Sequence, residues 1–220
     1  MGPLTLADIH DEQLRLAKAG SAYLIGYVLI YTATYSVFDI YFYDADAANL
    51  ILTIVMWGLG FALLVGVMKA GGLLVHGMRS GLGTYFGLGL LISFAVTFGL
   101  FLLLLPGLYL MMRWLSAYAR AVTTDEGAVA AMRWSWHASQ PAQMPLSIAL
   151  LPPVAIHFAA FGALFTAVPD AGSAVDAGGA LILIAVNAAI YIASAWLTLL
   201  GVAVYGLQSG QMDQLIDTLE

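Results

Sequence analysis

The chain has 220 residues, of which 62% are hydrophobic and 9% charged, whereas a typical soluble domain carries about 25% charged residues. Its formal net charge of -6 argues against nucleic-acid binding, which depends on basic patches. The absence of cysteine excludes disulfides, thiolate metal sites and cysteine nucleophiles. Several apolar runs reach the roughly 20 residues that span a bilayer, so we predict a polytopic membrane protein.

The N-terminal segment MGPLTLADIHDEQLRLAKA is polar and acidic. It lacks the basic start and short apolar core of a cleavable signal, so we expect it to be retained. Thr5, followed by Asp8 at the third position after it, predicts a capped helix. Its apolar residues fall on one side, which predicts that this short helix lies at the membrane interface.

Six apolar segments follow, and they predict an all-α helical bundle that forms a single membrane domain over residues 1–220. The predicted spans cover about residues 20–42, 47–68, 84–105, 108–122, 146–168 and 180–207. Pro106-Gly107 indicates a break between the third and fourth spans. Pro152-Pro153 predicts that the fifth span is kinked or locally unwound.

The fourth segment, 108–122, has only about fifteen residues, so it is either a short crossing or a half-helix. If it crosses, every basic residue outside a span lies on the side of the N-terminus. The opposite side then holds only acidic residues, namely Asp44, Asp46, Asp170 and Asp176. The positive-inside rule therefore favours a crossing, with both termini cytoplasmic. A crossing this short requires flanking interfacial helix or a thinner bilayer.

Two further short helices are predicted outside the spans. Thr123 and Glu126 have the spacing of a capping box, which predicts a cytoplasmic helix within the 123–139 segment. The C-terminal segment QSGQMDQLIDTLE places apolar residues at helical spacing beside acidic ones. This pattern predicts an amphipathic helix at the C-terminus.

Arg113 lies inside the fourth segment, where a charged side chain costs several kcal/mol unless it faces protein or water. If that span begins at Leu108 on the outer side, Arg113 lies at a depth comparable to that of Asp39 in the first span. We therefore predict a structural Asp39–Arg113 ion pair. The alternative is that Arg113 binds backbone carbonyls freed by Pro106, or a lipid phosphate.

Tyrosines recur at every fourth position of the first span and form a slowly winding stripe that leads to Asp39. The stripe consists of Tyr23, Tyr27, Tyr31 and Tyr35. Hydroxyl groups in hydrocarbon need partners, so the stripe predicts either a groove for a lipid or partner, or a packing face against neighbouring helices. His157 in the fifth span is a further candidate for this groove, or a buried histidine with satisfied hydrogen bonds.

The sequence offers no catalytic or metal-binding constellation. No two of its four histidines stand at helical i, i+4 spacing, so we expect no metal and no other cofactor. It contains no G-x-S-x-G motif, no phosphate loop and no paired intramembrane carboxylates. We therefore expect a protein that is not an enzyme.

Two segments resemble a bacterial superfamily of six-span membrane proteins, which includes YciC-like proteins and the membrane domains of some glycerophosphodiester phosphodiesterases. The first has the pattern P-G-x-Y-L-x-x-R and the second the pattern E-G followed by R-x-S-W. The matching residues are Pro106, Gly107, Tyr109, Leu110, Arg113, Glu126, Gly127, Ala131, Arg133, Ser135 and Trp136. The resemblance implies a helical bundle in the bacterial inner membrane. Trp134 stands where a second basic residue is common and no phosphodiesterase domain follows, so that activity is not carried over.

Two functions remain open at this point. The first is an accessory or scaffold subunit that docks against another membrane protein, or against a second copy of itself. The acidic C-terminal segment favours a protein partner because anionic lipid should repel it. The alternative is a binder or transporter of a lipid or other hydrophobic small molecule, because broken helices often line such sites.

Overall fold

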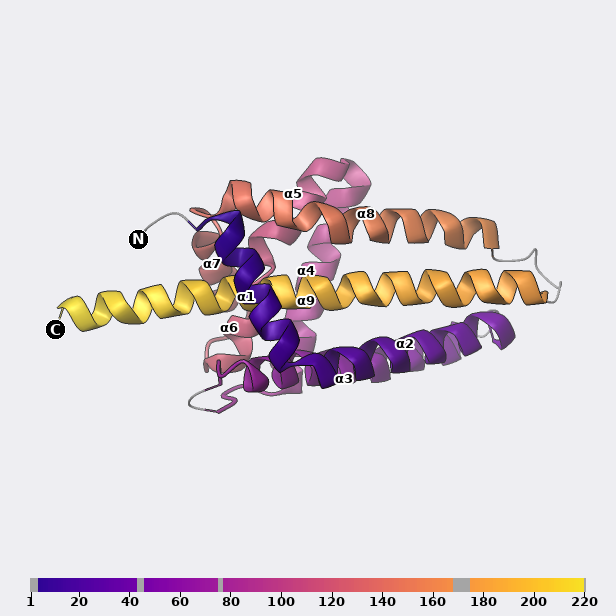
Figure 1. Ribbon diagram of the computed structural model, residues 1–220, viewed down its shortest axis with the longest axis horizontal. Coiled ribbons are helices and arrows are strands. Elements are labelled where there is room, and N and C mark those ends of the chain that lie inside the picture. Colours follow the sequence, from indigo (N-terminus) through magenta and orange to yellow (C-terminus); the bar gives the residue numbers. More distant parts are fainter. Residues whose placement is uncertain (1–3, 43–45, 75–76, 168–174, 220) are drawn as a thin grey trace. The chain divides into compact units, whose positions relative to one another are not determined.

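The computed structural model describes residues 4–42, 46–74, 77–167 and 175–219, and Figure 1 shows their arrangement along the chain. Over these residues the regular secondary structure is entirely helical, which confirms the all-α prediction. The helices are α1 (Leu6–Ala19), α2 (Ser21–Tyr41), α3 (Asp46–Ala70), α4 (Leu82–Leu102), α5 (Leu104–Trp114), α6 (Ala117–Thr123), α7 (Ala128–Ala138), α8 (Gln143–Ala167) and α9 (Ala177–Leu219).

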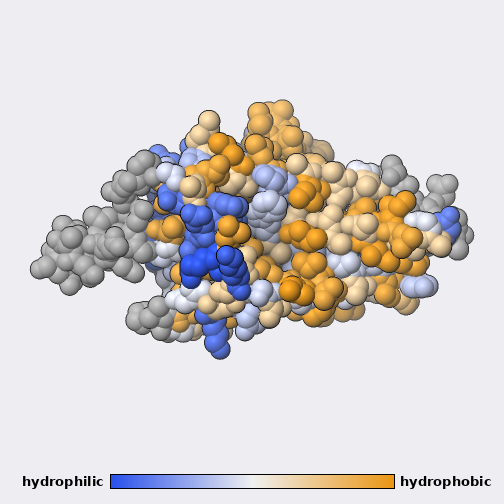
Figure 2. All heavy atoms as spheres, viewed as in Figure 1, coloured by the Kyte–Doolittle hydropathy of each residue, from blue (hydrophilic) through white to orange (hydrophobic). Residues whose placement is uncertain are grey.

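Five of the described helices are long and apolar enough to cross a bilayer. Their candidate spans are Ser21–Tyr41, Ala48–Ala70, Leu82–Leu102, Gln143–Leu164 and Ala177–Ser209. Figure 2 shows that apolar side chains cover much of the visible face, while hydrophilic residues gather over α1. Such an apolar surface is stable against lipid and not against water. The chain is therefore a membrane-embedded helical protein.

The chain forms two compact units. Unit 1 comprises Met1–Ser21, Leu64–Leu150 and Leu197–Glu220. Unit 2 comprises Ala22–Leu63 and Leu151–Trp196, so it is built from parts of α2, α3, α8 and α9. The composition of the sequence predicts one membrane domain over residues 1–220. The division into units passes through the long helices, where the sequence carries no linker or change of composition.

The N-terminal cap is confirmed in atomic detail. The Thr5 hydroxyl accepts a hydrogen bond from the Asp8 backbone N–H at 3.2 Å, and the Asp8 carboxylate accepts one from the Thr5 backbone N–H at 2.8 Å. These bonds from the Thr5 backbone and hydroxyl hold the pKa of Asp8 below its ordinary value. Ile9, Gln13 and Leu16 are buried along one face of α1, so the helix packs on one side.

The predicted fourth span is wrong as a single helix. The chain turns at Leu115–Ser116, which separates α5 from α6. Their 11 and 7 residues are each too few to cross a bilayer, which takes about 20. The break before this segment also lies earlier than predicted, at Leu103. Pro106 stands in the first turn of α5, where its missing N–H has no intrahelical acceptor to lose.

A close approach between α4 and α5 accounts for Gly107. A Cβ on Gly107 would lie 2.5 Å from the backbone nitrogen of Leu100. A Cβ on Gly99 would lie 2.9 Å from the Gly107 Cα atom. Real side chains do not approach so closely, so both positions require glycine for the two backbones to pack. The result is a tight helical hairpin with a single non-helical residue, Leu103, at its tip.

The two other predicted short helices form differently. Thr123 ends α6, and its hydroxyl lies within hydrogen-bond distance of the Ala119 carbonyl and the Tyr205 hydroxyl, so the predicted capping box is absent. Helix α7 begins after Gly127 instead. The C-terminal segment continues α9 to Leu219 and is not a separate helix. The side chains of residues 210–220 lie outside the described structure, as do the loop residues Asp44 and Asp170.

The prolines of α8 do not unwind it. Pro152 and Pro153 both lie inside a helix that runs without interruption from Gln143 to Ala167. The Pro153 carbonyl oxygen lies 3.0 Å from Nδ1 of His157, one turn further on.

Candidate functional site

Arg113 is buried against aromatic rings of unit 1. Only 2% of its surface is exposed. Its guanidinium carbon lies 4.5 Å from the centre of the Trp136 ring and 5.7 Å from that of Tyr109. These two rings meet edge to face at 5.7 Å. Among the described residues Nε and Nη1 of Arg113 have no hydrogen-bond partner, so the π faces provide the electrostatic counterpart of this cation.

Hydrogen bonds join the same two helices behind the guanidinium. The Ser135 hydroxyl of α7 donates to the Arg113 carbonyl oxygen at 2.8 Å. The Ser139 hydroxyl donates to the same oxygen at 3.4 Å. Ser116 lies 2.9 Å from Ser135, oxygen to oxygen. Three small buried polar side chains thus fix the end of α5 against α7.

The two segments that carry the family resemblance therefore contact each other. Tyr109 and Arg113 of the first segment meet Ser135 and Trp136 of the second. Two further matched residues lie between α6 and α7. Glu126 accepts hydrogen bonds from the Arg120 guanidinium at 2.5 and 3.2 Å, and Gly127 is the N-cap of α7. Arg133 is exposed.

Asp39 and Arg113 belong to different units, and each has another partner within its own unit. The Asp39 carboxylate accepts a hydrogen bond at 2.8 Å from the Asn187 side-chain amide. The same amide nitrogen lies 3.3 Å from the Ser36 hydroxyl, which makes a small polar network between α2 and α9. The predicted Asp39–Arg113 ion pair stays a prediction.

Three of the four stripe tyrosines pack around Tyr191 of α9, all within unit 2. The centre of the Tyr191 ring lies 4.6 Å from that of Tyr31, 5.4 Å from that of Tyr35 and 6.4 Å from that of Tyr27. The Tyr31 hydroxyl donates to the Met56 carbonyl oxygen. Tyr23, in contrast, is 46% exposed. The stripe is thus largely occupied by ring-to-ring contacts, as its packing interpretation expects.

His157 also has polar partners inside unit 2. Its Nε2 lies 3.2 Å from the Ser194 hydroxyl, while Nδ1 faces the Pro153 carbonyl oxygen. Both ring nitrogens are therefore within hydrogen-bond distance of an oxygen atom. Of the two interpretations of His157, a groove residue or a histidine with satisfied hydrogen bonds, these contacts agree with the second. The described part of the chain contains no group of three or more His, Asp or Glu side chains that could hold a metal ion.

A cavity of about 320 Å³ lies within unit 1, away from the tyrosine stripe. It is lined by residues of α3, α4, α5, α6 and α9 and is partly open. The lining residues are Leu64, Tyr85, Ile92, Ser93, Val96, Met111, Trp114, Leu115, Tyr118, Ala119, Leu197, Thr198, Gly201 and Val202. The break between α5 and α6 contributes Leu115, so the interruption of the predicted fourth span helps to form this cavity.

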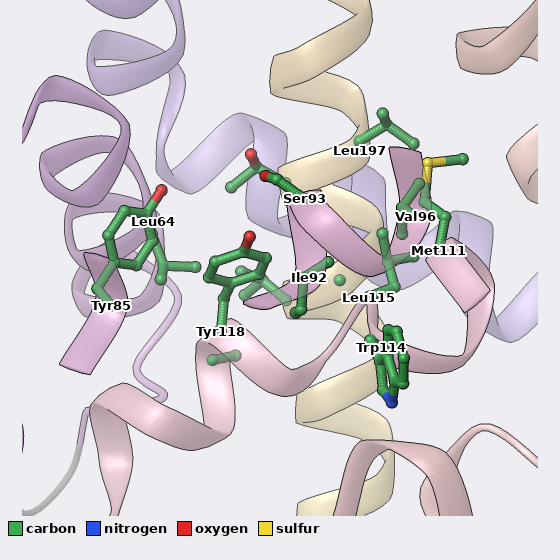
Figure 3. A pocket seen from close by; sticks show the side chains of 14 residues that line it. Leu64, Tyr85, Ile92, Ser93, Val96, Met111, Trp114, Leu115, Tyr118 and Leu197 are labelled. Carbon is green, nitrogen blue, oxygen red and sulfur yellow. The ribbon is translucent and has the colours of Figure 1, made fainter. Parts of the chain in front are cut away.

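The cavity has two unlike ends, which Figure 3 shows. Tyr85, Tyr118 and Ser93 lie toward one end, and the Tyr118 hydroxyl points toward Ser93. The rings of Tyr85 and Tyr118 are 5.2 Å apart. Val96 and Met111 lie toward the other end and present only apolar groups. Three of the four hydroxyl-bearing residues that line the cavity therefore lie toward one end of it (Figure 3).

Sequence reasoning missed this cavity. Its hydroxyl residues stand on three separate helices, and Tyr85, Ser93 and Thr198 show no shared spacing. The one available signal is the location of Trp114 and Tyr118 within the irregular segment 108–122. Irregular backbone in a membrane protein often lines a site.

Comparison with protein-family models, curated proteins and solved structures finds no match for this chain. The resemblance to the six-span superfamily rests on the two quoted segments and stays a prediction.

Proposed function

We propose that this protein binds a hydrophobic small molecule from the membrane in the cavity of unit 1. The observation that carries the proposal is the cavity itself, a space of about 320 Å³ lined almost entirely by apolar and hydroxyl-bearing side chains. Ligand sites in proteins have volumes of about 300–1,000 Å³ and consist of apolar walls with a few polar groups. The proposed ligand is a hydrophobic small molecule, as the tyrosine stripe of unit 2 also suggests. The proposed site, however, is the cavity of unit 1.

The walls of the cavity come largely from helices that contain apolar candidate spans. Its walls come from α3, α4 and α9, which are long apolar helices, and from α5 and α6 between them. Trp114 and Tyr118 add aromatic surface, which combines a large apolar contact with a polar edge. The proposed activity is binding without chemical change.

The test is to fill the cavity and measure ligand retention. Val96→Trp places a large ring in the space, and Val37→Trp is the matched control because Val37 is 51% exposed on α2. Each full-length variant is purified in nanodiscs and titrated with lipids that carry a photoreactive diazirine on the acyl chain. We expect saturable labelling near the cavity in the parent and in Val37→Trp, weakened about tenfold in Val96→Trp, which equals about 1.4 kcal/mol. Equal saturable labelling of all three would overturn the proposal.

A second candidate function, an accessory subunit that docks against another membrane protein, is favoured by the length of α9. This helix has 43 residues, and only Ala177–Ser209 of it is apolar enough to be a span. In Figure 1 its C-terminal end extends past α1 and α6 of the same unit. Removal of Ser209–Glu220 should then release a copurifying membrane protein. Unchanged association would refute docking through this segment.

A separate proposal concerns the membrane in which the chain lies and the side of that membrane on which its termini are found. We propose that the chain belongs to the six-span superfamily and lies in the bacterial inner membrane with both termini cytoplasmic. Because the chain has no cysteine, single cysteines introduced at Gly2 and at Ser209 report orientation directly. Both should be inaccessible to a membrane-impermeant thiol reagent added outside intact cells. Labelling of either one would contradict the orientation.

A further inference from the structure

We infer that the cavity of unit 1 selects an uncharged, single-chain amphiphile whose hydrogen-bonding head lies between Tyr118 and Ser93. The inference rests on the proposed function and names the chemical class of its ligand. A monoacylglycerol or a long-chain alcohol has this chemistry. A phospholipid or a fatty-acid anion does not.

Two hydroxyl groups at one end of the cavity are available to a ligand. No hydrogen bond joins the side-chain oxygen of Tyr118 or of Ser93 to another part of the described chain. The Tyr118 ring is held in place by Tyr85, whose ring centre lies 5.2 Å away. Figure 3 shows the Tyr118 hydroxyl directed toward Ser93. Because hydroxyl groups in apolar surroundings are normally bonded, these two define a place for a donor and acceptor group of the ligand.

Charge in the cavity wall argues against an ionic head. None of its fourteen lining residues is Asp, Glu, Lys, Arg or His. The two buried or half-buried cations of the adjoining segment are engaged elsewhere: Arg113 faces Trp136, and Arg120 pairs with Glu126 at 2.5 Å. An anion that entered would lose its hydration without gaining a counter-ion, which is strongly unfavourable. An uncharged head group loses much less hydration free energy on entering the cavity, and hydrogen bonds to the cavity wall offset that loss.

Size limits the apolar part of the ligand. The volume of about 320 Å³ is near the lower end of the range for ligand sites. The apolar end, at Val96 and Met111, therefore suits one hydrocarbon chain, and a two-chain lipid exceeds the space. The opposite polarity of the two ends also fixes the direction of the chain, with its head at Tyr118.

The experiment compares two probes that differ only in a phosphate group. One is a monoacylglycerol with a diazirine in its chain, and the other is lysophosphatidic acid with the same chain. The full-length protein in nanodiscs is titrated with each and the labelled peptides are quantified. We expect saturable labelling of the α4 and α6 segments by the monoacylglycerol, with at least about tenfold weaker labelling by lysophosphatidic acid.

Variants test the position of the head. Tyr118→Phe and Ser93→Ala should each weaken monoacylglycerol labelling by about fivefold, the factor expected for one neutral hydrogen bond. Tyr41→Phe is the matched control, because Tyr41 is 71% exposed on α2 and lies outside the cavity. Circular dichroism and thermal unfolding verify that each variant folds. If both cavity variants fold and bind as the parent does, the head does not lie at Tyr118 and the inference is overturned.

The remaining outcomes separate this inference from the proposed function. Equal labelling by the two probes overturns selection for an uncharged head and leaves hydrophobic ligand binding intact. If only two-chain lipids label the protein, and Val96→Trp weakens that labelling, selection of a single-chain ligand is overturned. Hydrophobic ligand binding in the cavity then still stands. Absence of saturable labelling by every lipid probe overturns the proposed function and this inference together.

Discussion

The guanidinium carbon of Arg113 lies 4.5 Å from the centre of the Trp136 ring, and this contact joins two helices that are separated by α6 in the sequence. It explains how aromatic rings of the same unit hold a cation in a strongly apolar chain. A flat, weakly hydrated guanidinium can stack on an aromatic face, whereas an ammonium group keeps its water more tightly. The contact is therefore a structural clamp between α5 and α7.

A double-mutant cycle tests this clamp. Arg113→Met and Trp136→Leu should each destabilise the protein, and the cycle should show a coupling of about 1–2 kcal/mol for a desolvated cation–π pair. Stability is measured by reversible unfolding in mixed detergent micelles. Arg133→Met, on the exposed side of α7, should change it by less than about 0.5 kcal/mol. A coupling near zero would show that Arg113 is held by something other than the ring.

Gly107→Ala should destabilise the α4–α5 hairpin by about 1–3 kcal/mol, because the added methyl group would overlap the Leu100 backbone. Gly87→Ala is the matched control on α4. A Cβ at Gly87 meets no atom within 4 Å, and alanine favours a helix by up to about 1 kcal/mol over glycine. The control should therefore be neutral or stabilising in the same unfolding assay. Equal stability of the two variants would contradict the close approach.

Asn187→Leu should destabilise unit 2 by about 1–3 kcal/mol, since it removes a donor from a carboxylate in a membrane span. The double variant Asn187→Leu, Asp39→Leu removes both polar partners and should recover much of that loss. Recovery is the informative result, because a purely steric role for Asn187 predicts none. Thermal unfolding of the three proteins in the same detergent measures it.

The N-terminal cap should depend on pH. The pKa of Asp8 is lower in the folded protein, so its carboxylate stabilises α1 above the unfolded value of about 4 and loses that effect as the pH falls below it. A spin label on Ala7→Cys should become more mobile below about pH 4 as the cap is lost. Asp8→Asn should abolish this step, whereas Asp11→Asn should keep it. A step that persists in Asp8→Asn would assign it to another group.

The sequence predicted the long helices well, because hydropathy over about 20 residues reports burial in lipid directly. It predicted the cap at Thr5 and failed at Thr123, although both have a suitable acidic residue three positions later. Two other contacts account for the difference. The hydroxyl groups of Thr123 and Tyr205, 82 positions apart in the sequence, lie 2.8 Å from each other, and Glu126 accepts hydrogen bonds from Arg120 instead of capping a helix. The Tyr205 contact is tertiary and cannot be read from local spacing.

The same limit applies to the candidate site. Arg113 is conspicuous in the sequence because it lies in an apolar segment. Asp39 is its predicted partner because it has the opposite charge and lies at a comparable depth in the first span. Its aromatic partner Trp136 belongs to the second segment that carries the family resemblance. Sequence spacing does not indicate that the two segments pack against each other. The sequence does not predict the position of the cavity, because its walls depend on where α5 ends and on how α9 passes Leu115.

The α4–α5 hairpin has a consequence for how the chain is threaded through the bilayer. Its tip is strongly apolar, with Phe101 87% exposed and Leu105 77% exposed. Such a tip is stable in hydrocarbon and not in water, and its one non-helical residue leaves few backbone groups to solvate there. A hairpin returns the chain to the face it left, whether its tip reaches the far headgroups or stops among the acyl chains. The number of basic residues on each side of the membrane is therefore the same whether the tip reaches the far headgroups or not. Proteases or polar reagents applied from the far side would find no loop at this position to cut or label.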